Sequence, residues 1–400
     1  MNSAPVPSAA PLRILQLNSL LTGGGTDDQC VKLAVALHRL GQQVWLAGPA
    51  GSEFSKGIEG AGLPFVDTGK GTSKLGFIRQ AAALIRREAI QIVHGHHGRD
   101  CWPTILAARL SGARPKIILT RHMAKSPSSL ASRYFLLNQC DVLIAVSEYV
   151  AKVLREGARD SASPEAERHW RPPLRGDYSK IRVVYGGIDL ARFRPFDATE
   201  KRRELGLAAE DFGFAVVGGY DLPRGKGQRE FLKAAVIVHE KIPRARFLII
   251  GRGSMAEVLR ADIERLGLTG KAWLTCYASD MPSVMNAIDC LVHPQIGTEA
   301  LGLVICEAHA CGKPVIASAL DGIPEAFAVG GLGQLVPPEN VAELGAAMAA
   351  QATRPALGAT GADALHEKVA AAFSVERSAN QVLQLYHECL NHGRAAGGTT

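Results

Sequence analysis

Residues 290–318 contain the sequence CLVHPQIGTEALGLVICEAHACGKPVIAS, and this stretch decides the fold class. Its apolar start, Cys290–Val292, has the composition of a buried strand, and a glycine-bounded loop follows it. A helix is predicted for residues 301–311, because Gly312 comes directly after the last apolar residue. A second apolar strand is predicted for 314–318. Strand, loop, helix and strand in this order form the repeating unit of a parallel α/β sheet.

Two glutamates, Glu299 and Glu307, lie eight positions apart in this stretch. Along a helix axis that spacing corresponds to roughly 12 Å at ~1.5 Å per residue, which matches the span from sugar to ribose in a nucleotide-diphosphate sugar. Carboxylates accept hydrogen bonds from the vicinal hydroxyls at both ends. The free amides of Leu301, Gly302 and Leu303 at the helix start suit the diphosphate between them. The alternative is a solvated helix face, which the flexible loop and the tight glycine stop disfavour.

Composition and length place the chain among globular proteins. Its 400 residues are 47% hydrophobic and 21% charged, which predicts two or three domains with ample core. No uninterrupted apolar run reaches the ~18 residues that span a bilayer, and the first eleven residues lack the pattern of a signal peptide. The eight cysteines include no C-x-x-C pair, which favours buried thiols in a reducing compartment. We therefore expect a cytoplasmic protein.

The net charge of +7 is distributed unevenly. Residues 1–190 contain 24 lysines and arginines against 15 acidic residues, whereas residues 191–400 contain 21 against 23. A basic first half suits an anionic membrane surface, hence peripheral association at its inner face, or a phosphorylated acceptor. The alternative is a surface that only confers solubility. No nucleic-acid-binding motif is present, so we expect no nucleic-acid partner.

Apolar strands alternate with amphipathic helices in both halves of the chain, and the pattern restarts near residue 212. This alternation predicts an α/β protein with two Rossmann-like domains that face each other across a cleft, at residues 1–190 and 191–372. The amphipathic segment within 373–400 is expected to form a helix that crosses back to the first domain. Residues 157–180 are rich in charge and proline, and are expected to form an exposed insertion.

Three loops carry further candidate binding residues. Gly24 and Gly25 follow a strand and open a helix, so the backbone there can approach a sugar or an acceptor closely; the alternative is a simple tight turn. Arg224 and Lys226 alternate with glycines at another helix start, where cations would stabilise a diphosphate leaving group without a metal; the alternative is a solvated basic turn. Arg252 lies in a G-x-G loop that resembles a dinucleotide-binding loop only in outline, and a short turn fits equally well.

Histidines follow two of the predicted strands, at His94, His96 and His97 and again at His122. No set of carboxylates or thiolates accompanies them, so we predict no metal site. His122 should point into the cleft, where its ring can form a hydrogen bond with a sugar hydroxyl. The alternative is that it is a structural residue at a strand end.

Taken together, these features resemble retaining glycosyltransferases of the GT-B fold, in the family-four group that includes bacterial lipopolysaccharide and lipid-linked sugar transferases. The most specific match is the block 299–318, which is similar to the family's signature of two glutamates separated by seven residues and its Gly-x-Pro-Val-Ile-Ala continuation. The resemblance covers nearly the whole chain. Its supporting matches are at residues 23–25, 94–96, 120–122, 145–148, 187–189, 193–195, 226–227 and 322–325.

The resemblance implies that the N-terminal domain binds the acceptor and the C-terminal domain binds the nucleotide sugar. Glu299, with the amides near Leu301, would hold the hydroxyls of the donor sugar, and Glu307 would hold the ribose. Lys226 would stabilise the departing diphosphate, and His122 would contact the transferred sugar near the reaction centre.

The nucleotide base is expected near Tyr277 and Arg252. The sequence departs from the family pattern at Asp221, where an arginine is usual five residues before Lys226, and at Gly186, where an asparagine is usual. Arg224 offers a replacement for the missing cation.

The expected function is retaining transfer of a sugar from a nucleotide-diphosphate sugar, with UDP-sugar as the favoured donor and no other cofactor. The acceptor would be a hydroxyl of a glycan or glycolipid, and lipopolysaccharide core fits. No second carboxylate is placed as a nucleophile, which favours a front-face route over double displacement. Two alternatives remain. Asp221 motivates a non-catalytic sugar-nucleotide-binding partner of another transferase; an NAD-dependent oxidoreductase is less favoured because the first strand is not followed by G-x-G-x-x-G.

Overall fold

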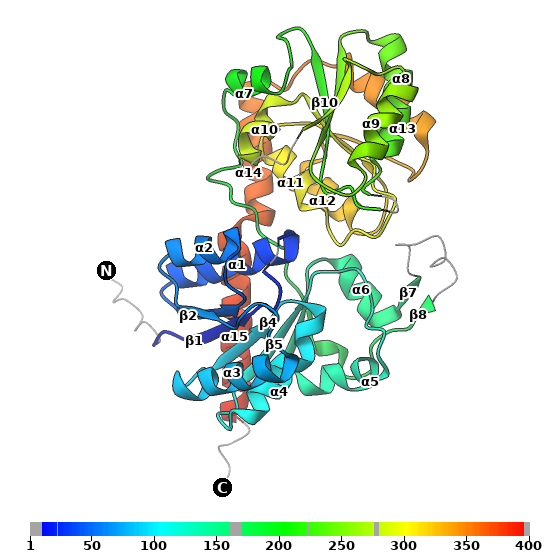
Figure 1. Ribbon diagram of the computed structural model, residues 1–400. Coiled ribbons are helices and arrows are strands. Elements are labelled where there is room, and N and C mark those ends of the chain that lie inside the picture. Colours follow the sequence, from blue (N-terminus) through cyan, green and yellow to red (C-terminus); the bar gives the residue numbers. More distant parts are fainter. Residues whose placement is uncertain (1–9, 22, 160–169, 223–224, 276–279, 396–400) are drawn as a thin grey trace, which may run out of the picture.

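The computed structural model describes residues 10–21, 23–159, 170–222, 225–275 and 280–395. Two α/β domains, each built on a parallel sheet, lie one above the other in Figure 1. The chain passes between them twice, after β9 (Ile181–Val183) and where α14 (Ala359–Phe373) runs into α15 (Val375–Ala395). These two crossings are joined by hydrogen bonds, since Ile188 N donates to Phe373 O over 2.8 Å and Val375 N donates to Ile188 O over 3.2 Å.

The N-terminal sheet has seven strands in the order β3-β2-β1-β4-β5-β6-β9. The order reverses between β1 and β4, which makes that point the topological switch at which open α/β sheets bind ligands. The other strands of this sheet are β1 (Arg13–Leu17), β2 (Gln43–Gly48), β3 (Phe65–Asp67), β4 (Ile92–Gly95), β5 (Lys116–Arg121) and β6 (Val142–Ala145). The helices of the domain are α1 (Gly25–Arg39), α2 (Glu53–Gly60), α3 (Lys74–Arg87), α4 (Cys101–Leu110), α5 (Leu130–Gln139) and α6 (Glu148–Glu156).

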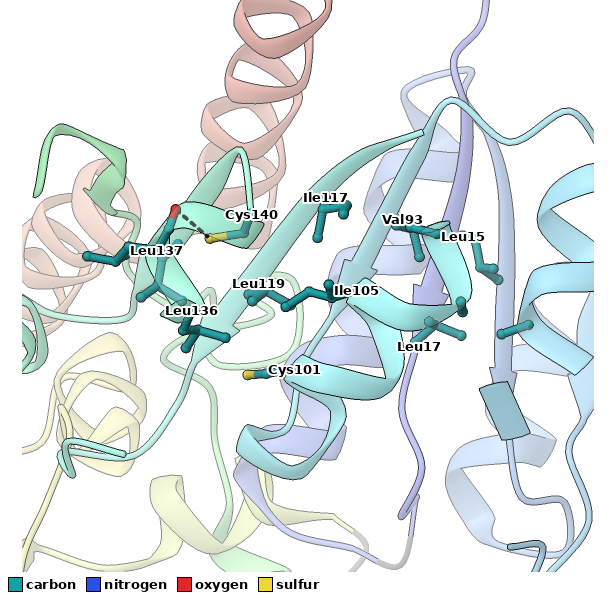
Figure 2. Close-up of a cluster of buried hydrophobic side chains, with 14 of the residues drawn as sticks. Leu15, Leu17, Val93, Cys101, Ile105, Ile117, Leu119, Leu136, Leu137 and Cys140 are labelled. Carbon is teal, nitrogen blue, oxygen red and sulfur yellow. Dashed lines mark hydrogen bonds between the residues drawn. The ribbon is translucent and has the colours of Figure 1, made fainter. Parts of the chain in front are cut away.

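Both faces of this sheet are buried. Successive side chains of a strand point to opposite faces, and each set packs in a separate hydrophobic cluster. Leu15 and Leu17 pack with Ile105 of α4 in one cluster (Figure 2). Ile14 points the other way, into a cluster formed with α1 and α15. Continuous apolar strands of this kind need helices on both sides, and the alternating sequence supplies them.

The C-terminal sheet has six strands in the order β12-β11-β10-β13-β14-β15, with its switch point between β10 and β13. Its strands are β10 (Phe212–Val217), β11 (Ala245–Ile250), β12 (Ala272–Thr275), β13 (Cys290–His293), β14 (Val315–Ser318) and β15 (Gly333–Val336). Besides α14, its helices are α7 (Thr199–Glu204), α8 (Gln228–Lys241), α9 (Ala256–Arg265), α10 (Met281–Ala287), α11 (Leu303–Ala310), α12 (Ile323–Gly330) and α13 (Val341–Ala352). The two Rossmann-like domains predicted from the alternation are therefore present.

The helix α15 returns to the N-terminal domain, where it runs behind the sheet beside α1 (Figure 1). Val382 and Leu385 are buried against that domain in the same cluster as Leu37 of α1. The C-terminal segment thus contributes core to the first domain. Among the described residues, no helix combines the length and apolar character needed to cross a bilayer.

Two sequence expectations need correction. The stretch 157–180 is not wholly an exposed insertion: β7 (Ala158–Arg159) pairs antiparallel with β8 (Trp170–Arg171), and Leu174 is fully buried; residues 160–169 lie outside the described part. The helix predicted from residue 301 begins at Leu303, because Gly302 has a left-handed backbone with φ of 85° and caps it. Leu301 and Gly302 therefore belong to the loop.

Candidate active site

A cavity of about 370 Å³ lies between the two domains, where the switch points of both sheets meet. It brings together most of the site residues predicted from the sequence. Those that line it are Gly25, His122, Lys226, Glu299, Leu301, Gly302, Leu303 and Glu307. Gly24 and Arg252 do not line it, and Arg224 and Tyr277 lie outside the described residues.

Glu299 and Lys226 form an ion pair at this cavity, with 3.0 Å between Glu299 Oε2 and Lys226 Nζ. The fully buried ring of His293 lies behind the pair, with its Nε2 3.7 Å from the same carboxylate oxygen. Burial raises the pKa of Glu299, but the charge and hydrogen bond of Lys226, with a smaller contribution from the nearby His293, outweigh that effect and hold the pKa well below its usual value. Glu299 is therefore a carboxylate at neutral pH.

The position of Lys226 depends on a glycine beside it. Gly227 has φ of 84°, and a Cβ atom there would lie 1.8 Å from Pro294 O, so no other residue fits without moving the backbone. The loop before α8 can for this reason lie directly against the end of β13. Lys226 Nζ consequently reaches Glu299, which lies beyond the same strand.

Glu299 is also fixed through its backbone. Its amide donates to Asp321 Oδ2 over 3.1 Å, and its carbonyl accepts from Gly322 N over 3.2 Å. Ser147 of the N-terminal domain donates to the carbonyl of the next residue, Ala300, over 2.6 Å. The segment that carries Glu299 is therefore held by both domains.

The helix α11 places anion-binding groups beside this segment. Gly302, the residue before its first turn, supplies no side-chain cap. The first amides of α11 and the positive end of its dipole therefore face the cavity that Leu301, Gly302 and Leu303 line. Glu307 lies one turn further along, also at the cavity. Burial raises the pKa of Glu307 to about 7, and Lys32 across the domain boundary lowers it only in part.

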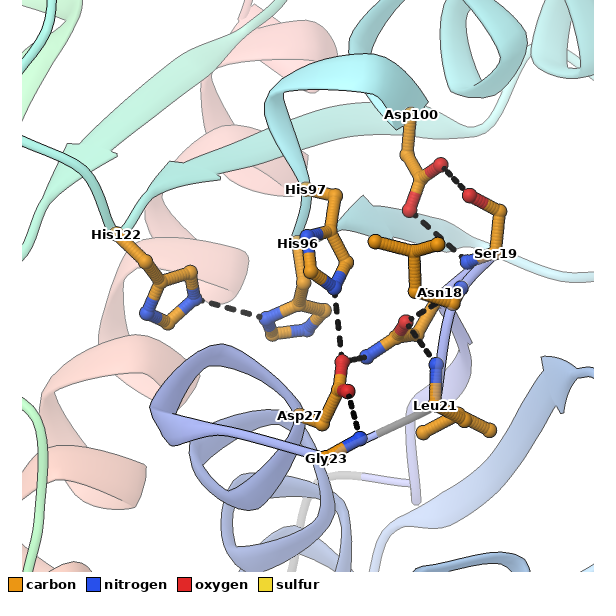
Figure 3. Close-up of polar contacts among 10 residues, drawn as sticks. Asn18, Ser19, Leu21, Gly23, Asp27, His96, His97, Asp100 and His122 are labelled. Atoms are coloured by element: carbon orange, nitrogen blue, oxygen red, sulfur yellow. Dashed lines mark hydrogen bonds and ion pairs between the residues drawn. The ribbon is translucent and has the colours of Figure 1, made fainter. Parts of the chain in front are cut away.

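On the N-terminal side, His122 lies beside His96, with 3.4 Å between His122 Nε2 and His96 Nδ1 (Figure 3). Asp27, at the start of α1, does not face the cavity as a free charge. Its carboxylate accepts from Asn18 Nδ2 over 2.9 Å and pairs with His97 Nε2 at 2.8 Å. Although burial raises the pKa of Asp27, these partners lower it overall. The carboxylate of Asp27 is thus held by side chains of its own domain.

A second contact between the domains lies beside the cavity. Glu325, in the first turn of α12, accepts hydrogen bonds from the free amides of Glu148 and Tyr149 at the start of α6, over 2.8 and 2.6 Å. Its Oε2 also accepts from the hydroxyl of Tyr185 over 3.2 Å. A carboxylate from one domain thus caps a helix of the other, which is favourable for both charge and hydrogen bonding.

The two positions that depart from the family pattern, Asp221 and Gly186, each have defined surroundings in the structure. Asp221 is exposed, and its Oδ1 accepts from Ser254 N over 2.9 Å, so it connects two loops rather than facing Lys226. At Gly186 a Cβ atom would lie 2.8 Å from Gln29 Oε1 and 3.3 Å from Leu303 Cδ1. A side chain at position 186 would therefore push against the domain boundary at the cavity wall.

A second cavity, of about 260 Å³, lies at the carboxyl end of the N-terminal sheet. Three exposed cations line it: Lys70, Lys74 and Arg99. Its floor includes Asp100, whose carboxylate is held by the backbone amide and hydroxyl of Ser19. Burial raises the pKa of Asp100. A basic rim over a polar floor suits an anionic ligand that also carries hydroxyls.

Sequence reasoning missed several of these residues. His293 was part of the quoted stretch but had no role assigned, and nothing in its neighbours indicates that its ring lies behind Glu299. Ser147 and Glu325 lie in segments that match the family, yet their contact depends on the packing of the two domains. The histidines hold no metal-like arrangement: within the described ranges no group of three or more metal-ligating side chains converges.

Comparison with known proteins places both halves in one family. Residues 23–192 match the family described as Glycosyltransferase Family 4, and residues 211–353 match Glycosyl transferases group 1. The chain belongs to the family-four glycosyltransferases. A curated relative, D-inositol 3-phosphate glycosyltransferase of Segniliparus rotundus, is 33% identical over 256 residues, which cover 61% of this chain and 55% of the relative. The match thus spans little more than half of that relative's length.

Solved structures agree on the fold of this family-four glycosyltransferase. A glycosyltransferase from Rickettsia africae ESF-5 aligns with a TM-score of 0.80 and 20% identity over 96% of this chain and 99% of that one. Anabaena HepE in complex with UDP-glucose aligns with a TM-score of 0.75 and 21% identity over 94% and 99%. The two Rossmann-like domains therefore form a GT-B fold.

Proposed function

We propose that this protein transfers a sugar from a nucleotide-diphosphate sugar to a hydroxyl of a phosphorylated acceptor, with retention of configuration at the anomeric carbon. The observation that carries the proposal is the convergence of Lys226, Glu299, Glu307 and the free end of α11 on one cavity between two domains. Cation, carboxylates and helix dipole are arranged in the order that a diphosphate flanked by two polyols requires.

The donor is proposed to lie along α11. The diphosphate binds at the first amides of the helix with Lys226 beside it, the ribose hydroxyls donate to Glu307, and the sugar hydroxyls donate to Glu299. The structure of Anabaena HepE is a complex with UDP-glucose, which supports a UDP-sugar as donor here. Arg252 and Gly24, which do not line the cavity, are proposed to contact the bound nucleotide at its rim.

Transfer is proposed to follow a front-face route. The acceptor oxygen forms its bond to the anomeric carbon on the face from which the diphosphate departs, and the acceptor proton passes to a diphosphate oxygen. Lys226 stabilises the charge that develops on the leaving group. Lys226 donates a hydrogen bond to the carboxylate of Glu299 over 3.0 Å. This bond lowers the nucleophilicity of the carboxylate, which favours a role in binding the sugar over a role as nucleophile.

The acceptor is proposed to be a phosphorylated polyol bound in the second cavity. Lys70, Lys74 and Arg99 would hold the phosphate, and Asp100 would accept from a hydroxyl. The name of the Segniliparus rotundus relative specifies an inositol phosphate acceptor. A phosphorylated glycolipid, such as lipopolysaccharide core at a membrane surface, has the same chemistry at its head group and is the second source to test.

The test is an assay of the purified protein with UDP-sugars and two acceptors, D-inositol 3-phosphate and a phosphorylated lipopolysaccharide core fragment. Proton NMR of the product reports the anomeric configuration. We expect product with one acceptor, an unchanged anomeric configuration, and loss of activity in Glu299→Gln, while Glu264→Gln on the exposed side of α9 stays active. A protein that binds UDP-sugar but neither transfers nor hydrolyses it would instead be a binding partner of another transferase. Reduction of NAD in place of transfer would favour the oxidoreductase.

A further inference from the structure

A path of hydrogen-bonded, buried polar side chains connects His122 with the C-terminal helix α15. Its members are Gln16 on β1, His94 on β4, His96 directly after it, and Tyr386 on α15. Each of the four has at most 2% of its surface exposed. Buried polar groups cost free energy unless they are hydrogen-bonded, so each donor on this path must face an acceptor.

The contacts form a continuous path. Gln16 Nε2 donates to the Tyr386 hydroxyl over 3.2 Å, and Gln16 Oε1 lies 2.6 Å from His96 Nε2. His96 Nδ1 faces His122 Nε2 at 3.4 Å. On the other branch, the Tyr386 hydroxyl lies 2.6 Å from His94 Nδ1. The path therefore connects a residue of α15 to the ring that lines the donor cavity.

Every imidazole on this path is neutral at physiological pH. Burial lowers the pKa of His94 and of His122 to about 3, and it lowers the pKa of His96 well below the usual value. A neutral imidazole carries a single N–H, on one of its two nitrogens. Which nitrogen carries it is decided by the partners of the ring.

The Gln16 carboxamide decides which atoms on this path donate hydrogen bonds and which accept them. Its oxygen can only accept, so His96 must carry its proton on Nε2, and His96 Nδ1 is then an acceptor. His122 must donate to that acceptor from Nε2. The remaining nitrogen of His122, Nδ1, then has no proton, and Figure 3 shows it on the side of the ring away from His96.

We propose that Gln16 and Tyr386 are positioning residues that hold His122 as its Nε2–H tautomer, so that Nδ1 accepts a hydrogen bond from a hydroxyl of the transferred sugar. This role rests on the proposed transferase function. The opposite tautomer would present an N–H to the sugar and would select a different hydroxyl orientation. The C-terminal helix thus sets the chemistry of a residue in the N-terminal half.

Tyr386 is the member that fixes the carboxamide. Its hydroxyl accepts from the Gln16 amide nitrogen and donates to His94 Nδ1, and His94 can then donate from Nε2 to Thr120 Oγ1 at 2.6 Å. Without the hydroxyl, the Gln16 amide nitrogen and His94 Nδ1 lose their shared partner. The carboxamide can then rotate, and His96 and His122 can exchange tautomers together.

The experiment combines imidazole NMR with kinetics on the full chain. In protein labelled with nitrogen-15 at histidine, His122 should show a protonated Nε2 and an unprotonated Nδ1, assigned by loss of its signals in His122→Gln. In Tyr386→Phe both tautomers of His122 should be populated. The kcat of Tyr386→Phe should fall about tenfold, the loss expected for one hydrogen bond to the sugar. The Kd for UDP, which lacks the transferred sugar that contacts His122, should stay unchanged.

A packing variant separates this role from stability. Leu385→Ala removes buried apolar contact from the same helix, and the leucine side chain cannot form a hydrogen bond with the path, so this variant should lower the melting temperature yet keep the kcat and the His122 tautomer of the wild type. An Nδ1–H tautomer in the wild type, or a Tyr386→Phe protein with unchanged tautomer, would overturn the proposal. If the wild type transfers no sugar at all, the proposed function fails, and the tautomer measurement still decides whether Gln16 and Tyr386 orient the ring.

Discussion

Glu307→Gln should stabilise the free protein at neutral and alkaline pH while weakening donor binding. The carboxylate of Glu307 lies on α11 at the donor cavity, where it forms no hydrogen bond or ion pair with the described residues. Burial raises the pKa of Glu307 to about 7, and Asp28 nearby raises it further while Lys32 opposes both. The ionised form of Glu307 therefore destabilises the folded protein as long as no ligand hydroxyl donates a hydrogen bond to it.

The magnitude follows from proton linkage. The carboxyl has a pKa of 4.5 as its reference value and about 7 in the folded protein, so the folded state holds its proton more tightly. No penalty exists below the unfolded pKa; the penalty grows as pH rises between the two values and is complete above the folded one. At ~1.36 kcal/mol per pKa unit the limit is about 3 kcal/mol. Glutamine has no charge and avoids this cost.

The assay is thermal unfolding of wild type and Glu307→Gln at pH 4.5 and pH 8, with Glu264→Gln as the control. The variant should gain several degrees at pH 8 and nearly none at pH 4.5. The Kd for UDP should rise at least tenfold, and the affinity of the wild type should improve from pH 6 to pH 8, because the ribose hydroxyls need the ionised form. An equal gain at both pH values, or a less stable variant at pH 8, would refute the reasoning.

Three further predictions address other parts of the site. Lys226→Ala should lower kcat by about two to three orders of magnitude, as loss of a charge at a leaving group does, and titration should show the pKa of Glu299 rising without its cation. Glu325→Gln should cost about 1–2 kcal/mol in unfolding experiments, because two amides of α6 lose a charged acceptor, whereas Glu264→Gln should cost nearly nothing. Lys70→Ala should raise the KM for a phosphorylated acceptor but leave the KM for the donor unchanged in steady-state kinetics; an equal change in both would place the acceptor elsewhere.

Local sequence patterns predicted the fold because each element carries its own signals. The apolar runs gave both parallel sheets, and Gly312 gave the end of α11. The start of the same helix was placed two residues early, because Leu301 continues the apolar pattern while Gly302 takes a left-handed backbone that ends the loop. A backbone conformation of this kind is a property of the folded loop and leaves no trace in hydrophobic spacing.

The site was predictable where its residues share one segment, and less so where they come from several. Glu299 and Glu307 stand in one motif, so their spacing alone indicated a two-ended ligand. The ring of His293 behind Glu299 and the cap that Glu325 places on α6 depend on contacts between distant segments. The contact of Asp27 with His97, seventy positions away, could likewise not be predicted from local sequence.

The donor segment depends on both domains, and this has a mechanistic consequence. Glu299 N is held by Asp321 of its own domain, while the adjoining carbonyl of Ala300 is held by Ser147 of the other. Tyr149 of the other domain also acts on Asp321, because it opposes the rise that burial causes in the pKa of the Asp321 carboxyl. Any rotation that separates the domains must therefore break contacts to the segment that positions Glu299. The orientation of Glu299 is therefore coupled to the relative position of the two domains through these few hydrogen bonds.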